Sequence, residues 1–158
     1  MVAGGVGLAP FATLTEALLE RATTTTLFYG ARSGAELFYL DWFASRGVRL
    51  VLSTEDGSKG ERGRVTIPLE QALRESSGEI MIYACGPERM LEAVSQVAGK
   101  YKTPAQVSVE RVMGCGMGGC YSCVIPIREA GGRHHYVRSC LAGPVFTASD
   151  LVWDHEQA

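Results

Sequence analysis

Four of the chain's five cysteines are concentrated in one glycine-rich stretch and a short segment beyond it. Cys115, Cys120 and Cys123 are separated by four and then two residues, and Cys140 follows after sixteen more. A C-x4-C-x2-C run with a distant fourth cysteine is the ligand spacing of plant-type [2Fe–2S] clusters. The spacing therefore predicts that these four thiolates bind a [2Fe–2S] cluster.

Glycines lie between and beside these cysteines, where the chain has to wrap tightly around a small cluster. Gly114, Gly116, Gly118 and Gly119 permit positive φ angles and a close approach of the backbone. Backbone N–H groups that reach the sulfur atoms offset the negative charge of a cluster and tune its reduction potential. The glycines are thus consistent with the predicted ligand set.

Other uses of the cysteines compete with this prediction. Disulfides are disfavoured because an odd number of cysteines, five, cannot all be paired. The chain is also expected in a reducing compartment, where disulfides are rare. Zinc is the main alternative because four thiolates suit a tetrahedral ion, although structural zinc sites usually join two closely spaced cysteine pairs. The remaining alternative is that the cysteines are inert thiols. A Rieske centre needs two Cys–His pairs, which adjacent His134 and His135 do not provide. We expect these histidines and His155 to have no ligand role.

A second glycine-rich turn, AGGVGLAPF at residues 3–11, opens the chain. Gly4, Gly5 and Gly7 would let a pyrophosphate approach backbone N–H groups at the start of a helix predicted from Pro10. A plain tight turn is the alternative, because turns use glycine without any ligand. Such loops normally follow a buried strand, and only a few residues precede this one, so we expect the first strand to be largely missing.

Two more short motifs end predicted strands. YGAR places Arg32 after one strand, and ACGP places Cys85, Gly86 and Pro87 after another. Ligands of parallel sheets lie at the carboxyl ends of the strands. Arg32 therefore either pairs with a phosphate or is simply solvated. Cys85 is either a thiol close to a nicotinamide or a small buried apolar residue.

The elements that position these motifs alternate between helix and strand up to about residue 108. Strands are predicted at 23–30, 48–54 and 79–86, and helices from Pro10, over 37–44, over 69–76 and after Pro87. The run EIMIYACG is almost continuously apolar, as in a parallel strand covered on both faces. The pattern predicts a doubly wound parallel α/β sheet over residues 1–108 and a small [2Fe–2S] module over residues 109–158.

Composition narrows the class of protein. The chain has 158 residues, 46% hydrophobic and 20% charged, which is enough to bury a core. A net charge of -2 argues against nucleic acid as the partner, because phosphate binding requires a basic excess. No apolar run approaches the ~18 residues of a membrane span. We expect a cytoplasmic protein that binds neither nucleic acid nor membrane.

The motifs together resemble a known family. GGVGLAPF, YGAR and CGP, in this order, resemble the pyridine-nucleotide domain of the ferredoxin–NADP reductase superfamily. With ERVMGCGMGGCYSCVIP and CLAGPVF added, the chain resembles the iron–sulfur flavoprotein electron-transfer subunits of class 1B dihydroorotate dehydrogenases. Related hydrogenase and glutamate-synthase-like subunits start their cluster motif with an aspartate-containing pattern, where Cys115 stands here.

The resemblance implies an electron carrier of pyrimidine biosynthesis. Such a subunit connects NAD, through FAD and a [2Fe–2S] cluster, to the FMN of a dihydroorotate-oxidising partner chain, in a heterotetramer. The family's FAD-binding barrel is absent from this chain, which looks like the portion that follows it, so FAD is implied for the full-length protein. Met113, Met117 and Tyr121 either line the partner interface or shield the cluster. A reductase component for a hydrogenase or oxygenase, and a zinc-stabilised nucleotide-binding module without redox function, are the alternatives.

Overall fold

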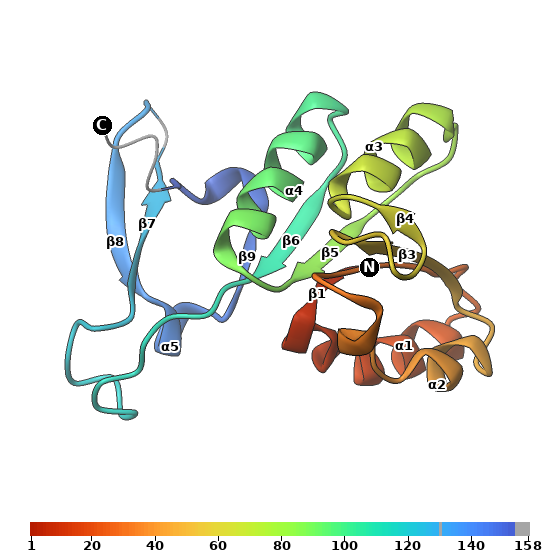
Figure 1. Ribbon diagram of the computed structural model, residues 1–158. Helices are drawn as coiled ribbons and strands as arrows, with labels where there is room; N and C mark the ends of the chain where they lie inside the picture. The colour runs from red at the N-terminus through yellow and green to blue at the C-terminus, as the bar shows by residue number, and fades with distance from the viewer. Residues whose placement is uncertain (130, 154–158) are drawn as a thin grey trace.

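The protein is described by a computed structural model that covers residues 1–129 and 131–153 (Figure 1). Its centre is a seven-stranded sheet in the order β4-β3-β2-β1-β5-β6-β9, in which every pairing is parallel except that of β6 with β9. The strands of this sheet are β1 (Val2–Gly4), β2 (Thr26–Ala31), β3 (Arg49–Thr54), β4 (Glu61–Arg62), β5 (Ile82–Cys85), β6 (Ala105–Ser108) and β9 (Val145–Thr147).

Helices cover both faces of the sheet. Helices α1 (Pro10–Glu20) and α2 (Leu40–Ala44) lie on one face, and α3 (Thr66–Glu75) and α4 (Glu88–Lys100) lie on the other (Figure 1). Each face has its own buried cluster: Phe11 and Phe43 pack with Tyr29 on the first, and Leu91 packs with Val107 on the second. The predicted doubly wound α/β sheet is confirmed.

The first strand differs from the prediction that it is largely missing. β1 has only three residues, but it lies at the centre of the sheet, paired with β2 on one side and β5 on the other. Two parallel neighbours satisfy its backbone groups, and Val2 and Ala3 are almost fully buried. A very short strand therefore suffices to hold the glycine turn in place.

The segment at 37–44 is helical over less of its length than predicted. A short 3-10 turn, η2 (Gly34–Glu36), precedes it, and Leu37 then has an extended backbone. Tyr39 adopts a left-handed conformation with φ of 57° just before α2 begins at Leu40. Because a left-handed residue interrupts the helical hydrogen-bond pattern, the apolar stripe is divided between two elements.

The last third of the chain builds a hairpin and then returns to the sheet. Strands β7 (Val124–Arg128) and β8 (His134–Arg138) pair antiparallel, followed by α5 (Ser139–Ala142), β9 and a 3-10 turn, η3 (Ala148–Asp150). Strand β9 adds to β6, and Ile125, Leu151 and Trp153 join the buried cluster beneath α4. The part after residue 109 thus shares its sheet and core with the nucleotide-binding part, and the predicted boundary at 108/109 stays a prediction.

Candidate functional site

The glycine turn is pressed against the end of β5. It follows β1 as a 3-10 turn, η1 (Gly5–Leu8), that leads into α1. A Cβ atom on Gly7 would overlap the Cys85 carbonyl and lie 2.6 Å from the Gly86 nitrogen. A Cβ on Gly86 would lie 3.0 Å from the Gly4 nitrogen. Glycine is required here because backbone meets backbone, so two motifs that are distant in sequence form one surface.

A cleft of about 460 Å³ opens beside this contact. Of the predicted nucleotide-binding residues, Gly4, Gly5, Arg32 and Pro87 line it. Gly7, Cys85 and Gly86 are not part of its wall, and neither is Pro10. The cleft therefore meets the start of η1 rather than the first residue of α1.

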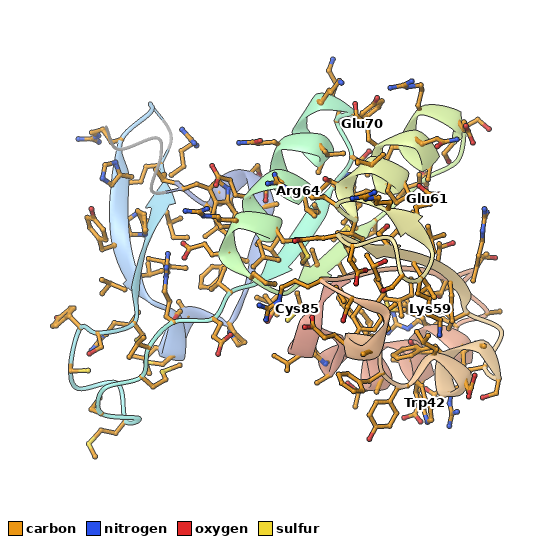
Figure 2. The ribbon with its side chains drawn as sticks, viewed as in Figure 1. Trp42, Lys59, Glu61, Arg64, Glu70 and Cys85 are labelled. Carbon is orange, nitrogen blue, oxygen red and sulfur yellow. The ribbon has the colours of Figure 1, made fainter. Side chains whose placement is uncertain are left out.

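Sequence reasoning missed two arginines of this cleft. Arg64 and Arg89 line it together with Arg32, and all three side chains are exposed; Arg64 is labelled in Figure 2. Glu36 and Glu55 are the acidic residues of the wall. Arg64 ends the motif ERGR and Arg89 ends the motif CGPER, and each motif includes the end of a strand. A basic residue shortly after a strand end is therefore the feature of the sequence that could have indicated them.

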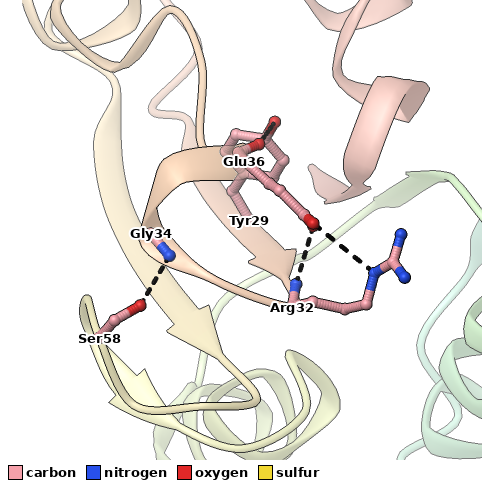
Figure 3. A network of polar contacts seen from close by, with 5 residues as sticks. All are labelled: Tyr29, Arg32, Gly34, Glu36 and Ser58. Carbon is pink, nitrogen blue, oxygen red and sulfur yellow. Dashed lines mark hydrogen bonds and ion pairs between the residues drawn. The ribbon is translucent and has the colours of Figure 1, made fainter.

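Arg32 forms a weak ion pair with Glu36, and an anion in the cleft can replace Glu36 as its partner. Its Nε lies 3.7 Å from Glu36 Oε1, and its backbone N–H donates to Glu36 Oε2 at 3.3 Å (Figure 3). The Arg32 side chain is 82% exposed, and exposed ion pairs contribute little to stability. On the same segment the Gly34 N–H donates to Ser58 Oγ at 2.7 Å, which fastens it to the loop after β3.

The Tyr29 hydroxyl connects the glycine turn with the segment of residues 32–36. Its ring is fully buried in β2, and its hydroxyl lies 3.3 Å from the Gly5 carbonyl oxygen and 3.2 Å from that of Glu36. Burial raises the pKa of Tyr29. The hydroxyl is therefore neutral at physiological pH, and its single hydrogen is shared between two carbonyl acceptors, one on each side of the cleft.

Cys85 occupies the carboxyl end of β5, beside the glycine turn (Figure 2). The side chain is half-buried, and desolvation raises its pKa, although a hydrogen bond with Ser108 opposes this effect. The negative charge of Glu110 acts in the same direction as burial. Its surroundings therefore favour the protonated thiol over the thiolate.

A second cavity of about 240 Å³ joins the nucleotide-binding part to the cysteine segment. Gly86 and Pro87 line it on one side, and residues 109–112 line it on the other. Arg111 bridges the two sides through an ion pair with Glu88 at 2.8 Å. Because Pro87 borders both cavities, the CGP motif lies between the nucleotide cleft and the start of the cysteine loop.

The first two cysteines of the motif form a pair on the exposed loop. Cys115 Sγ accepts the backbone N–H groups of Cys120 at 3.4 Å and Gly119 at 3.2 Å. The backbone N–H groups of Cys120, Met117 and Gly119, that of Cys120 foremost, lower the pKa of Cys115 to about 6 together with the Cys120 thiol. The loop thus presents N–H groups to sulfur as predicted, because a thiolate is stabilised by hydrogen bonds to its charged form.

The other two cysteines form a second pair. Cys123 and Cys140 have their sulfur atoms 3.2 Å apart, and the Ser139 N–H donates to the Cys123 carbonyl at 3.0 Å. The backbone N–H and thiol of Cys140 lower the pKa of Cys123, and the shared hydrogen bond raises the pKa of Cys140. The negative charge of Cys115 also contributes to the raised pKa of Cys140.

The donor set suits an iron–sulfur cluster. The four thiols lie on one loop and one distant segment, and a Cβ on Gly114 would lie only 3.2 Å from Cys120 Sγ, so a larger residue would intrude beside this predicted ligand. Within residues 1–129 and 131–153, no three His, Cys, Asp or Glu side chains already stand at metal-binding distances from one another. The structure brings the thiols together as two pairs, and their role as ligands stays a prediction.

The histidines lie away from the thiol pairs, on β8. His135 Nδ1 is 3.0 Å from Glu129 Oε1, and the His134 ring packs edge-on against Tyr136 with centroids 5.6 Å apart. Both side chains are exposed. His155 lies outside the described residues.

Comparisons with known proteins agree with the two-part site. The chain belongs to the oxidoreductase NAD-binding domain family, which it matches over residues 1–96. Residues 110–152 match the iron–sulfur cluster binding domain of dihydroorotate dehydrogenase B. The resemblance predicted from the motifs is thereby confirmed, and the cysteine segment falls within the second match.

Relatives match nearly the whole chain. A protein of Methanocaldococcus jannaschii named "Probable dihydroorotate dehydrogenase B (NAD(+)), electron transfer subunit" is 37% identical over 98% of this chain and 57% of its own length. The electron transfer subunit of dihydroorotate dehydrogenase B (NAD(+)) from Desulforamulus reducens is 32% identical over 98% of this chain and 58% of its own length. The chain thus spans somewhat more than half the length of these relatives.

A solved structure has the same fold. It is described as NADH-dependent reduced ferredoxin–NADP oxidoreductase, in work on flavin-based electron bifurcation. It matches 99% of this chain and 54% of its own with a TM-score of 0.81 and 29% sequence identity. Among the residues that the structure describes, no helix is both long and apolar enough to cross a membrane.

Proposed function

We propose that this chain is the NAD- and cluster-binding part of a dihydroorotate dehydrogenase B electron-transfer subunit. In this role it carries electrons between NAD and the FMN of a catalytic partner chain, in a heterotetramer of cytoplasmic pyrimidine biosynthesis. The match of residues 110–152, which contain all four predicted ligands, to the cluster-binding domain of that enzyme carries the proposal. FAD belongs to the full-length protein and would lie near Gly86 and Pro87.

The nucleotide cleft binds the dinucleotide through backbone and arginine groups. Gly4 and Gly5 let the pyrophosphate reach backbone N–H groups, and Arg32, Arg64 and Arg89 supply positive charge to the same cleft. The nicotinamide end points toward Pro87, on the side of the cysteine loop. Cys85, protonated and half-buried, borders that end without forming a covalent bond.

The cysteine loop binds the [2Fe–2S] cluster through Cys115, Cys120, Cys123 and Cys140. When bound, the cluster supplies one-electron transfer between two flavins. Backbone N–H groups at Cys115 Sγ stabilise the thiolate form that a ligand requires. Met113, Met117 and Tyr121, all exposed, lie on the same loop and form part of the partner-facing surface.

One further function is favoured by a specific observation. The structure described as NADH-dependent reduced ferredoxin–NADP oxidoreductase covers 99% of this chain with a TM-score of 0.81. A reductase component for another redox partner therefore competes with the dihydroorotate role. Isolation of the tagged protein under anaerobic conditions separates the two: an FMN-containing dihydroorotate-oxidising chain co-purifies in the first case, and a different redox protein in the second.

Metal analysis and spectroscopy test the cluster. After anaerobic reconstitution we expect about two irons and two sulfides per chain and an EPR signal only after reduction by dithionite. Cys115→Ser, Cys120→Ser, Cys123→Ser and Cys140→Ser should each reduce the cluster content, whereas Cys85→Ser, outside the ligand set, should not. A colourless chain that retains one zinc ion instead would contradict the electron-carrier role.

Nucleotide titration tests the cleft. Arg64→Ala and Arg89→Ala should each weaken NAD binding by about tenfold, the loss expected for a charge-assisted phosphate contact. Arg49→Ala is the matched control, because Arg49 is an exposed arginine at the amino end of β3, away from the carboxyl-end cleft. Equal losses in all three variants would indicate a non-specific charge effect.

A further inference from the structure

Arg138 connects the two segments that carry the predicted cluster ligands. It is the last residue of β8 and stands two positions before Cys140. Its guanidinium Nη1 donates a hydrogen bond to the Gly118 carbonyl, and its Cζ lies 5.3 Å from the centroid of the Tyr121 ring. Both contacted residues lie in the loop between Cys115 and Cys123, so one side chain spans from the fourth-ligand segment to the loop.

The loop tip has few other close neighbours. A Cβ placed on Gly116 or Gly119 would meet no atom of another segment within 4 Å. Gly118 differs, because a Cβ there would lie 2.9 Å from Leu141 Cδ2, so the α5 side chain packs on it. Gly118 is thus held by Leu141 on one side and by Arg138 through its carbonyl, and the tip is attached to the Cys140 segment at this point.

The charge of Arg138 matters as well as its contacts. A guanidinium stays protonated at every physiological pH, and its planar donors fit a carbonyl and an aromatic face at once. Reduction adds negative charge to a cluster, so a fixed cation beside the loop favours the reduced state. The side chain is only partly exposed, which weakens screening of this charge by solvent.

We propose that Arg138 is a positioning residue of the cluster site, which fixes the 115–123 loop against the Cys140 segment and raises the reduction potential of the bound cluster. This inference rests on the proposed role of the four cysteines as ligands. It makes two separable predictions: the contacts of Arg138 order the loop even without metal, and its charge sets the potential after loading.

The first prediction is tested on the metal-free chain by amide hydrogen exchange. Arg138→Met and Arg138→Lys should each raise exchange at residues 116–121 by about tenfold, because neither side chain makes both contacts. Arg133→Met is the matched control: Arg133 lies in the same hairpin and is exposed, and its loss should leave exchange in the loop unchanged. Unchanged exchange in both Arg138 variants would overturn the positioning role.

The second prediction is tested by EPR-monitored redox titration of the reconstituted chains. Arg138→Met should lower the reduction potential, whereas Arg138→Lys should stay close to the wild-type value because it keeps the charge. A potential that is equal in the wild type and Arg138→Met would overturn the electrostatic role. If the wild type itself binds no cluster, the proposed function fails, while the hydrogen-exchange comparison still decides the loop contact. Should Arg138→Met not fold, Arg138→Lys decides that contact alone.

Discussion

The contact between the glycine turn and β5 gives a sharp prediction for Gly7→Ala. The new Cβ would overlap the Cys85 carbonyl, 2.5 Å from the carbonyl carbon and 2.6 Å from the Gly86 nitrogen. The Cys85 atoms belong to a strand paired on both sides, with β1 and β6, and Gly86 follows that strand directly, so the clash is with backbone and no flexible side chain can move out of the way. The turn itself must shift.

The cost of this shift follows from the packing. Overpacking a well-packed interior typically costs 1–3 kcal/mol, and a contact with backbone on both sides belongs at the upper end, about 3 kcal/mol. The displaced turn also moves the N–H groups at the start of η1. We expect NAD binding about tenfold weaker, which corresponds to about 1.4 kcal/mol.

Urea unfolding and NAD titration measure the two effects on the same preparation. Gly99→Ala is the matched control, since Gly99 lies on the exposed side of α4 with nothing within 4 Å of its Cβ position. Alanine there should stabilise the chain by about 0.5 kcal/mol, because it lowers the entropic cost of the helix, and leave NAD binding unchanged.

A Gly7→Ala chain as stable as the wild type would contradict this prediction, because the close approach of turn and strand would then not exist in solution. A loss of stability with unchanged NAD binding would mean that the contact between turn and strand exists but does not affect the nucleotide site. A Gly99→Ala chain that lost as much stability as Gly7→Ala would show that both effects are non-specific.

Further predictions concern the CGP thiol and one surface pair. In the full-length protein, Cys85→Ala should slow hydride transfer in stopped flow while the cluster spectrum is preserved; an unchanged rate would leave Cys85 as a packing residue. Glu70→Gln removes a solvent-exposed ion pair between Glu70 and Lys100, whose charged atoms lie 2.6 Å apart. The variant should be slightly less stable than the wild type at low salt, and this difference should disappear in about 1 M salt, which screens the ion pair.

Most helices and strands, and the four candidate cluster ligands, can be predicted from the amino-acid sequence alone. Helices and strands follow the apolar periodicity, which is a local property. The structure confirms the three predicted strands as β2, β3 and β5, and the helices α1, α3 and α4, whereas β4 and β6 were not predicted. The spacing of Cys115, Cys120 and Cys123 is also local, because three ligands on one short loop must converge. Gly7 and Gly86 were recognisable as motif residues, although the reason for glycine, their mutual contact, was not.

The contacts between residues that are distant in the sequence could not be predicted and are known only from the fold. It placed Arg64 and Arg89 in the nucleotide cleft, returned β9 to the sheet, and set Arg138 on the cysteine loop. None of these contacts has a periodicity or a fixed spacing, since each depends on how separate elements pack against a common sheet. A sequence pattern reports the propensity of one segment, whereas the site is built where the ends of several segments are brought together by burial of their apolar faces.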